Sequence, residues 1–271
     1  MVKIGDKELI RDALRIVEEA RKRGIVLRIM GALAIRLHAK DFSELHRRLS
    51  RLGRQGGQFT DIDMVTYRSQ REAAHKMFIE LGYKPDRLVM AYFGESRFLY
   101  HHPEDLYHID LFFEKLQFSH DIDLGSKEKQ EQGRLELDYP TLTLADLLLE
   151  KIQIHEINEK DIKDLIVLLR EHGLAEDDIE ECINIKRVAS VLSQDWGFWY
   201  DAKVNLEKVT EFSGRYHADS LLEKEDVEDV FAKVKRILSY VDEAPKTKAW
   251  LKRAKDGTRK KWWKDVEELV R

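Results

Sequence analysis

The chain has 271 residues, of which 43% are hydrophobic and 9% aromatic, so it can bury the core of one large domain or of two ordinary ones. Charged residues make up 36% and the formal net charge is −4, a composition that excludes a disordered chain and gives no overall sign of a polyanion partner. The N-terminus lacks an apolar signal core and no stretch approaches the roughly 18 apolar residues of a membrane span, so we expect a cytoplasmic protein.

The N-terminal part predicts a helix, a strand and a second helix. Apolar residues recur with helical spacing over residues 6–23, and Gly24 ends this stretch. Residues 25–30 are a short apolar run typical of a buried strand, after which Gly31 opens a helical stretch that reaches about residue 40. Because a helix N-terminus presents free backbone N–H groups, this strand–glycine–helix turn is a candidate phosphate-binding element.

The middle of the sequence alternates between strand and helix patterns. Residues 41–59 are basic and end in a glycine-containing loop. In chain order we then expect a strand over 61–67, a helix over about 69–81, a hairpin of 88–93 with 97–101, and a strand over 107–113. Residues 1–140 therefore predict an α/β domain with a mixed sheet.

Pro140 marks the predicted domain boundary, because strand patterns stop there and helical periodicity continues to the C-terminus. We expect residues 141–271 to form an all-α domain, with helices over about 144–157, 159–172, 175–194, 203–212, 220–242 and 245–270. Cys182 falls in the third of these helices, among acidic neighbours that disfavour a thiolate, so we expect it to be structural.

Three acidic residues form the candidate metal site. Asp61 and Asp63 are two apart in a strand pattern, so their side chains point to the same side while Ile62 points into the core. Two neighbouring carboxylates repel each other, and a hard divalent cation, Mg²⁺ or Mn²⁺, removes that cost. Asp110 stands in the strand over 107–113 and supplies a third ligand if that strand lies beside the first.

Other interpretations of the acids remain open. Asp-Ile-Asp at 61–63 can simply begin an exposed edge strand, because the pattern is common. Asp121-Ile122-Asp123 is a second pair of the same kind, and the polar loop after it makes it the weaker candidate.

The histidines near Asp110 suggest a zinc site as a further interpretation. They are His101, His102 and His108. Strand alternation places His108 on the same face as Asp110 but does not produce a tetrahedral set, which favours surface or supporting roles for these side chains.

The order of these motifs resembles the DNA polymerase beta nucleotidyltransferase superfamily. Within it, the chain looks most like the nucleotidyltransferase-type toxins of abortive-infection systems and their uncharacterised relatives. That group combines a Gly-Gly-x-Ala-like turn, an Asp-x-Asp strand and a helical Lys…Lys-Asp-x-x-Asp motif. The matching residues, within about 25–170, are Gly31-Ala32-Leu33-Ala34, Thr60-Asp61-Ile62-Asp63, His108-Ile109-Asp110, Lys151 and Lys160-Asp161-Ile162-Lys163-Asp164.

The resemblance implies transfer of a nucleoside monophosphate from a nucleoside triphosphate (NTP) to a hydroxyl acceptor, with release of pyrophosphate. It implies that Asp61 and Asp63 bind two metal ions, and that Asp110 binds the catalytic ion and helps to activate the hydroxyl. It places Gly31 and Ala32 against the phosphates. It also implies a toxin–antitoxin-like setting with a protein partner.

Two positions depart from the family pattern. Ala32 stands where many active members have Ser or Gly, so no hydroxyl is present there to hold the triphosphate and a backbone contact is left. The toxin-like motif also usually has an Arg shortly before its Lys-Asp, and residues 155–159 contain none. A catalytically degenerate nucleotide- or partner-binding module is therefore an alternative function.

Lys151 lies on the core-facing side of its predicted helix with Leu144 and Leu148. Its ammonium group either forms an internal ion pair or contacts the triphosphate. Asp161 and Asp164 are three apart and share a helix face. They either pair with Lys151 or assist the attacking hydroxyl, and pairing is favoured.

A metal-dependent phosphohydrolase is the alternative enzyme class. It is suggested by the adjacent His120 and Asp121 together with the remote His75 and His101. That class carries its His-Asp pair on a helix, whereas the pattern around His120 predicts a strand followed by a loop.

The C-terminus concentrates positive charge. Residues 244–271 contain ten Lys or Arg against four Asp or Glu, a local +6 that leaves −10 for the rest of the chain. Trp250, Trp262 and Trp263 are interleaved with these cations, a mixture suited to RNA. The alternative is that the tryptophans pack on the preceding helices and the lysines form a solvated face, which the acidic overall charge favours.

Overall fold

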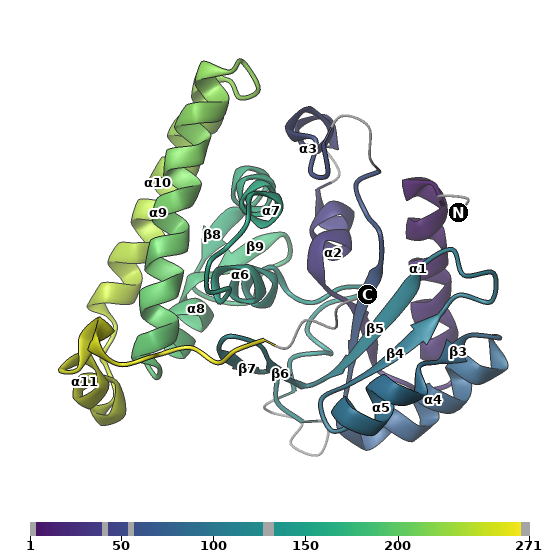
Figure 1. Ribbon diagram of the computed structural model, residues 1–271. Coiled ribbons are helices and arrows are strands. Elements are labelled where there is room, and N and C mark those ends of the chain that lie inside the picture. The colour runs from purple at the N-terminus through teal and green to yellow at the C-terminus, as the bar shows by residue number, and fades with distance from the viewer. Residues whose placement is uncertain (1–3, 40–42, 54–56, 127–132, 267–271) are drawn as a thin grey trace. The chain divides into compact units, whose positions relative to one another are not determined.

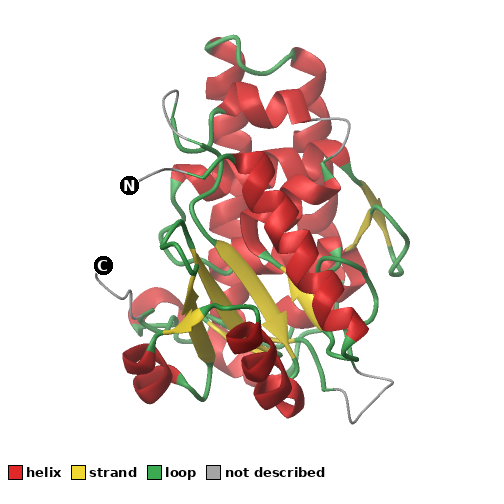
Figure 2. Cartoon of the chain, turned by 90° about the vertical axis from the view of Figure 1, so that its right-hand side faces the viewer, coloured by secondary structure: helices red, strands yellow, loops and turns green. Residues whose placement is uncertain are grey.

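The computed structural model describes residues 4–39, 43–53, 57–126 and 133–266 of the chain (Figure 1). The chain folds into two compact units. The first, which we call the sheet unit, comprises Met1–His38, Leu52–Leu116 and Asp123–Thr143, and the second, the helical unit, comprises Ala39–Arg51, Gln117–Ile122 and Leu144–Arg271. Helices predominate over strands along the described chain (Figure 2). None of these helices is both long and apolar enough to cross a membrane.

A mixed sheet of five strands lies at the centre of the sheet unit. Its order is β1 (Leu27–Ile29), β2 (Ile62–Thr66), β5 (His108–Phe113), β4 (Arg97–His101) and β3 (Lys84–Pro85). β2 and β5 run parallel, whereas the other neighbouring pairs are antiparallel. The strands are rich in β-branched and aromatic residues, which favour a pleated and buried surface. The predicted α/β character with a mixed sheet is confirmed.

The described helices of the sheet unit mostly lie where apolar periodicity predicts them. They are α1 (Asp6–Lys22), α2 (Gly31–His38), α4 (Arg71–Glu80), which follows a 3₁₀ turn η1 (Arg68–Gln70), and α5 (Arg87–Phe93). α1 buries a stripe that includes Leu9, Ala13 and Ile16 and contacts β1. α2 begins immediately after β1 and contacts β2, so the predicted strand–glycine–helix turn is present.

The predicted hairpin of residues 88–93 with 97–101 is wrong in its first arm. Residues 97–101 form β4, but residues 88–93 belong to α5. The Asp86 side chain accepts hydrogen bonds from the backbone N–H groups of Leu88 and Val89, which starts a helix at this point. Leu88 is 72% exposed, so the apolar run does not form a buried strand.

The helical unit contains most of the second half of the chain. Its described helices are α3 (Ser43–Leu49), α6 (Leu144–Ile152), α7 (Glu159–Glu171), α8 (Ile185–Leu192), α9 (Trp196–Ala218), α10 (Lys224–Glu243) and α11 (Lys248–Ala254). α3 comes from the first fifth of the sequence and contacts α7. Two short strands, β6 (Lys115–Gln117) and β7 (Asp121–Asp123), each include residues of both units and pair with each other. The boundary near Pro140 stays a prediction of domain organisation.

The prediction that residues 141–271 are all helical is wrong at two strands. β8 (Gly173–Ala175) begins just before the predicted helix over 175–194, β9 (Cys182–Asn184) lies within it, and the two strands form a parallel pair. Asn184 caps α8, because its side chain accepts a hydrogen bond from the backbone N–H of Arg187, so the helix begins only at residue 185. Cys182 consequently lies on a strand and not on a helix.

The predicted helix over 245–270 is also wrong in its extent. α11 ends at Ala254 and is followed by a 3₁₀ turn, η2 (Gly257–Arg259). Gly257 has φ +56°, a left-handed conformation that interrupts a helix. Residues 260–266, which we call the C-terminal segment, have neither helix nor strand and run away from α11 as the yellow trace in Figure 1.

The C-terminal segment is held within the helical unit by aromatic and polar contacts. Trp262 donates from Nε1 to the Asp201 carboxylate at 3.0 Å, and Trp263 stacks on His155 with ring centroids 3.7 Å apart. A Cβ atom on Gly197 would lie 2.6 Å from the Trp262 carbonyl oxygen, so only glycine gives the segment room on α9. These two tryptophans therefore pack within the helical unit, as the alternative to RNA binding predicts.

We expect the stability that Asp201 contributes to disappear in acid. Burial alone would raise the pKa of its carboxyl, but hydrogen bonds from His120, Trp262 and His155 outweigh burial and lower the pKa below the ordinary value of about 3.9. A lowered folded-state pKa stabilises the fold above the unfolded-state value and loses this effect as pH falls through the folded-state value.

Asp201→Asn tests this expectation. At neutral pH it should lower the free energy of unfolding by on the order of 2–3 kcal/mol, because the donors lose a charged acceptor. Urea unfolding followed by tryptophan fluorescence should show that the difference from wild type shrinks as the pH drops below about 4. If the difference in unfolding free energy between Asp201→Asn and wild type stayed constant at low pH, the lowered pKa of Asp201 would be contradicted.

Candidate functional site

The parallel pairing of β2 with β5 brings two of the predicted carboxylates together. Asp63 and Asp110 are direct register partners on these neighbouring strands. Register partners in a parallel pair point to the same face of a sheet, so both side chains lie on one side. The side chain of Asp110 is only 8% exposed. The two strands are therefore neighbours, which is the condition under which the sequence makes Asp110 a third candidate ligand.

His108 connects Asp61 to the same place. Its Nε2 atom lies 3.4 Å from Oδ2 of Asp61 and 3.5 Å from Oδ2 of Asp110. His108 opens β5, two residues before Asp110, and Asp61 directly precedes β2. The structure thus gathers Asp61, Asp63 and Asp110 at the start of two parallel strands, with an imidazole between two of them. We call these three residues and His108 the acidic cluster.

Arg97 is a cation of this site that no sequence pattern indicated. Its Nη1 atom lies 3.7 Å from Oδ1 of Asp110, and its guanidinium lies over the ring of Phe93, 5.4 Å from the centroid. Arg97 begins β4, the neighbour of β5, so it meets Asp110 only through sheet pairing. His108 had a sequence signal, because strand alternation puts it on the face of Asp110, whereas Arg97 had none.

Gly31 lies against the acidic cluster at the first residue of α2. The backbone N–H of Met30 donates to the Asp63 carbonyl at 2.9 Å. A Cβ atom on Gly31 would lie 2.7 Å from Oδ2 of Asp63, and Gly31 has φ +69°. Both its conformation and its space therefore require glycine. Ala32, the second predicted phosphate contact, follows it in the first turn of α2 and is buried.

We expect Gly31→Ala to disturb the site more than a comparable change elsewhere. Gly24 is a matched control, because it also has φ +69° and a Cβ atom there would meet no atom of the described chain within 4 Å beyond its immediate neighbours. Gly24→Ala should cost only the left-handed backbone strain, about 1 kcal/mol. Gly31→Ala should cost roughly 2–4 kcal/mol in urea unfolding, because Asp63 must also move. If both variants lost the same free energy of unfolding, the added methyl group at residue 31 would not clash with Asp63.

The chemistry of the acidic cluster fits a divalent metal ion. Three carboxylates supply hard oxygen ligands of the kind that Mg²⁺ and Mn²⁺ prefer. In the described residues no group of three or more His, Cys, Asp or Glu side chains is already arranged around a common metal position. His108 lies between Asp61 and Asp110, so a metal ion there requires its ring to turn aside or to join the ligands.

Lys151, Asp161 and Asp164 form a buried ion-pair network in the helical unit. Nζ of Lys151 lies 2.7 Å from Asp161 and 3.2 Å from Asp164. Arg51, which the sequence did not single out, donates from Nε to Asp164 at 2.9 Å. Burial alone would lower the pKa of Lys151, but Asp161 and Asp164 outweigh it and hold the pKa above its ordinary value. The ion pair that the sequence favoured is present.

The second Asp-x-Asp pair has other partners. Asp121 forms an ion pair with Lys264 at 2.6 Å, and Asp123 accepts a hydrogen bond from the backbone N–H of Gly125 at 2.8 Å. Both residues lie on β7, so the expected strand and loop are present.

The remaining candidate histidines contact different groups. His101 lies 3.3 Å from Asp86, His102 accepts from the backbone N–H of Glu104, and His75 pairs with the Tyr100 hydroxyl. His120 is buried and bonds to Asp201 at 2.8 Å. These separate contacts give no support to the zinc or phosphohydrolase interpretations.

Comparison with known proteins adds no relative. No protein-family model matches the chain, no curated protein matches it, and no solved structure matches it. The family resemblance therefore rests on the sequence motifs alone.

Proposed function

We propose that the chain is a metal-dependent nucleotidyltransferase, which moves a nucleoside monophosphate from an NTP to a hydroxyl acceptor and releases pyrophosphate. The observation that carries the proposal is the register pairing of Asp63 with Asp110, with Asp61 joined to them through His108. Gly31 supports it, because the first turn of α2 lies directly beside Asp63. In this proposal the sheet unit is the nucleotidyltransferase domain. The proposed domain boundaries are residues 1–140 for that domain and 141–271 for a mainly helical domain.

The chain's own groups have distinct tasks in this reaction. Asp61, Asp63 and Asp110 would hold Mg²⁺ or Mn²⁺, which supplies charge neutralisation at the phosphates and polarises the α-phosphate. The acceptor oxygen forms a bond to the α-phosphorus as the bond to the pyrophosphate oxygen breaks, and Asp110 takes the hydroxyl proton. Gly31 and Ala32 would offer backbone N–H groups at the positive end of α2 to the phosphates.

The second candidate is a degenerate module that binds a nucleotide or a protein partner without turnover. Ala32 favours it, because a methyl group replaces the hydroxyl found in many active relatives. His108 favours it as well, because its ring already contacts two of the three carboxylates. An antitoxin-like protein partner, which the resemblance implies, is compatible with both candidate functions.

Two measurements separate these candidates. Calorimetry with each NTP, with and without Mg²⁺, tests binding. Incubation with each NTP labelled at the α-phosphate, Mg²⁺ and a mixture of cellular RNA, protein and metabolites tests transfer. Metal-dependent binding with a labelled product supports the enzyme, and binding without product supports the degenerate module. If the chain neither binds an NTP nor transfers the label, the enzyme and the nucleotide-binding module are both refuted.

We further propose that the acceptor is RNA and that it docks on α11. The structure divides the basic residues into two groups. Some are engaged internally: Arg253 donates to the carbonyls of Gly257 and Lys260, and Lys264 pairs with Asp121. Others are exposed and spaced by four and three residues along one side: Lys248 and Lys252 on α11, and Lys255, its C-cap.

We expect reversal of this face to weaken RNA binding. Lys248→Glu, Lys252→Glu and Lys255→Glu together should lower the affinity for single-stranded RNA by at least about tenfold and the salt slope by about 2, because roughly three phosphate contacts are lost. Lys22, Lys76 and Lys224 changed to Glu give the same change of charge elsewhere and should have a smaller effect. Equal effects of the two triple variants, measured by fluorescence anisotropy across salt concentrations, would refute the docking face.

A further inference from the structure

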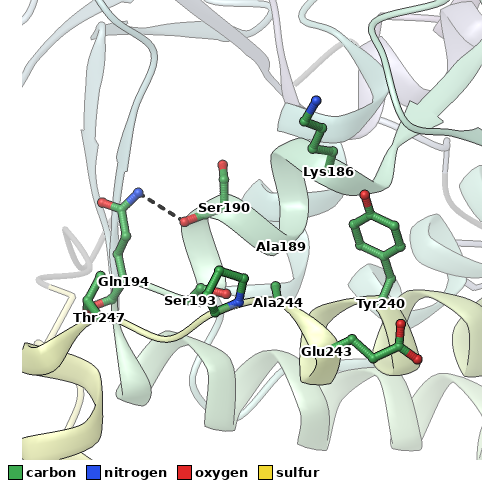
Figure 3. A pocket seen from close by; sticks show the side chains of 10 residues that line it. Lys186, Ala189, Ser190, Ser193, Gln194, Tyr240, Glu243, Ala244 and Thr247 are labelled. Carbon is green, nitrogen blue, oxygen red and sulfur yellow. Dashed lines mark hydrogen bonds between the residues drawn. The ribbon is translucent and has the colours of Figure 1, made fainter.

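A pocket of about 590 Å³ lies within the helical unit, and none of the candidate site residues predicted from the sequence lines it (Figure 3). Its walls come from one face of α8, the last turn of α10 and the linker that follows α10. Hydrogen bonds hold the linker in place, because the backbone N–H of Thr247 donates to the Ser193 carbonyl at 3.1 Å and Lys246 Nζ donates to the Ala244 carbonyl at 2.8 Å. The walls of the pocket are therefore held in place by helix packing and by the hydrogen bonds of the linker.

The middle of the pocket is apolar and has one aromatic wall. Ala189 on α8 lines it together with Ala244 and Pro245, which follow α10. The ring of Tyr240 stands beside the two alanines (Figure 3). The Tyr240 hydroxyl donates to Glu176 at 3.2 Å, which fixes the ring. The Arg236 guanidinium lies over the Tyr240 ring, 5.7 Å from its centroid, so a flat heterocycle would stack on the other face of the ring, next to the small apolar side chains.

Polar groups surround this apolar middle. Lys186 and Ser190 lie four residues apart on α8, Gln194 follows two residues after the end of α8, and Glu243 ends α10. Gln194 donates from Nε2 to the Ser190 carbonyl, as the dashed line in Figure 3 shows, and this bond orients the amide. Lys186 offers one cation, Ser190 a hydroxyl, and Glu243 an acceptor.

We propose that this pocket binds a nucleoside monophosphate without a metal ion. The base would stack on Tyr240 above Ala189, its exocyclic amine would donate to Glu243, and its phosphate would pair with Lys186. One lysine matches one phosphate group, whereas a triphosphate would need further cations or a metal ion. The site lies on other elements than the acidic cluster and does not depend on the proposed transfer reaction.

Binding of AMP in the presence of EDTA tests the proposal by calorimetry, with adenosine as a second probe. Lys186→Glu should weaken AMP binding at least about tenfold and leave adenosine binding nearly unchanged, because only the phosphate contact is lost. Ser190→Trp should weaken both probes, because the indole fills the pocket. Lys224→Glu, an exposed lysine at the other end of α10, should change neither. Circular dichroism confirms that each variant is folded.

The outcomes that would overturn the proposal are distinct. Absence of AMP binding to the wild-type chain refutes it, and so does AMP binding that Ser190→Trp leaves intact. Loss of AMP binding in Asp63→Ala would place the nucleotide at the acidic cluster instead. If NTP transfer is absent but AMP binds in the predicted manner, this pocket stands while the proposed function fails.

Discussion

Asp63→Ala is expected to reduce metal-dependent NTP binding and transfer by more than about a hundredfold while the fold stays intact. In the proposed site this substitution removes a metal ligand that lies between its register partner Asp110 and the first residue of α2. It also removes one of several neighbouring negative charges, so thermal stability without metal should be unchanged or higher. Calorimetry with NTP and Mg²⁺, label transfer and thermal unfolding measure the three effects.

Asp123→Ala is the matched control for this variant. Asp123 is the last residue of the other Asp-x-Asp pair, and its side chain accepts a hydrogen bond from Gly125. Its replacement should leave NTP binding and transfer close to wild type. Full activity of Asp63→Ala, or equal loss in Asp123→Ala, would show that the metal pair is assigned to the wrong strand.

Lys151→Met is expected to have the largest effect on stability, a loss of about 3–5 kcal/mol in urea unfolding. It leaves Asp161 and Asp164 buried with less compensating charge, because Lys151 contacts both within 3.2 Å. Arg51 still pairs with Asp164, so the uncompensated charge concentrates on Asp161. Adding Asp161→Leu should therefore recover part of the loss, since a buried ion pair replaced on both sides is often close to neutral.

Lys163→Met is the control on α7. Lys163 is 12% exposed and pairs with Glu159, which is 56% exposed, so no buried carboxylate loses its partner and the control should cost about 1–2 kcal/mol, less than Lys151→Met. NTP affinity of the same variants decides the other role predicted for this network. Lys151→Met with wild-type stability but weaker NTP binding would mean that the ammonium group contacts the triphosphate.

Local patterns predicted the elements that carry the acidic cluster. The strand at 61–67, the helix opening at Gly31 and the strand at 107–113 all have strong apolar periodicity, and all are present. The pairing of Asp63 with Asp110 was conditional on the two strands being neighbours, which no local pattern decides. The structure supplies that step through the parallel register of β2 and β5.

The failures have local and long-range causes. Residues 88–93 are apolar and suggested a strand, but the capping of α5 by Asp86 and the exposure of Leu88 decide for a helix. The short strands β8 and β9 form because they pair with each other, and the helix predicted over 175–194 covered β9 and the last residue of β8. Arg97 and Arg51 gained their partners only through the fold, because sheet pairing and helix packing set those contacts.

The ion pair between Arg51 and Asp164 also constrains the order in which the chain can fold during its synthesis. The two residues are 113 positions apart, yet both belong to the helical unit. At about 5–20 residues per second, Asp164 follows Arg51 from the ribosome by roughly 6–23 s. α3 therefore emerges early and must wait, while most of the sheet unit is made, before α7 provides its packing partner. The helical unit can therefore complete its packing only after α7 has been made, although α3 is among the first segments to be translated.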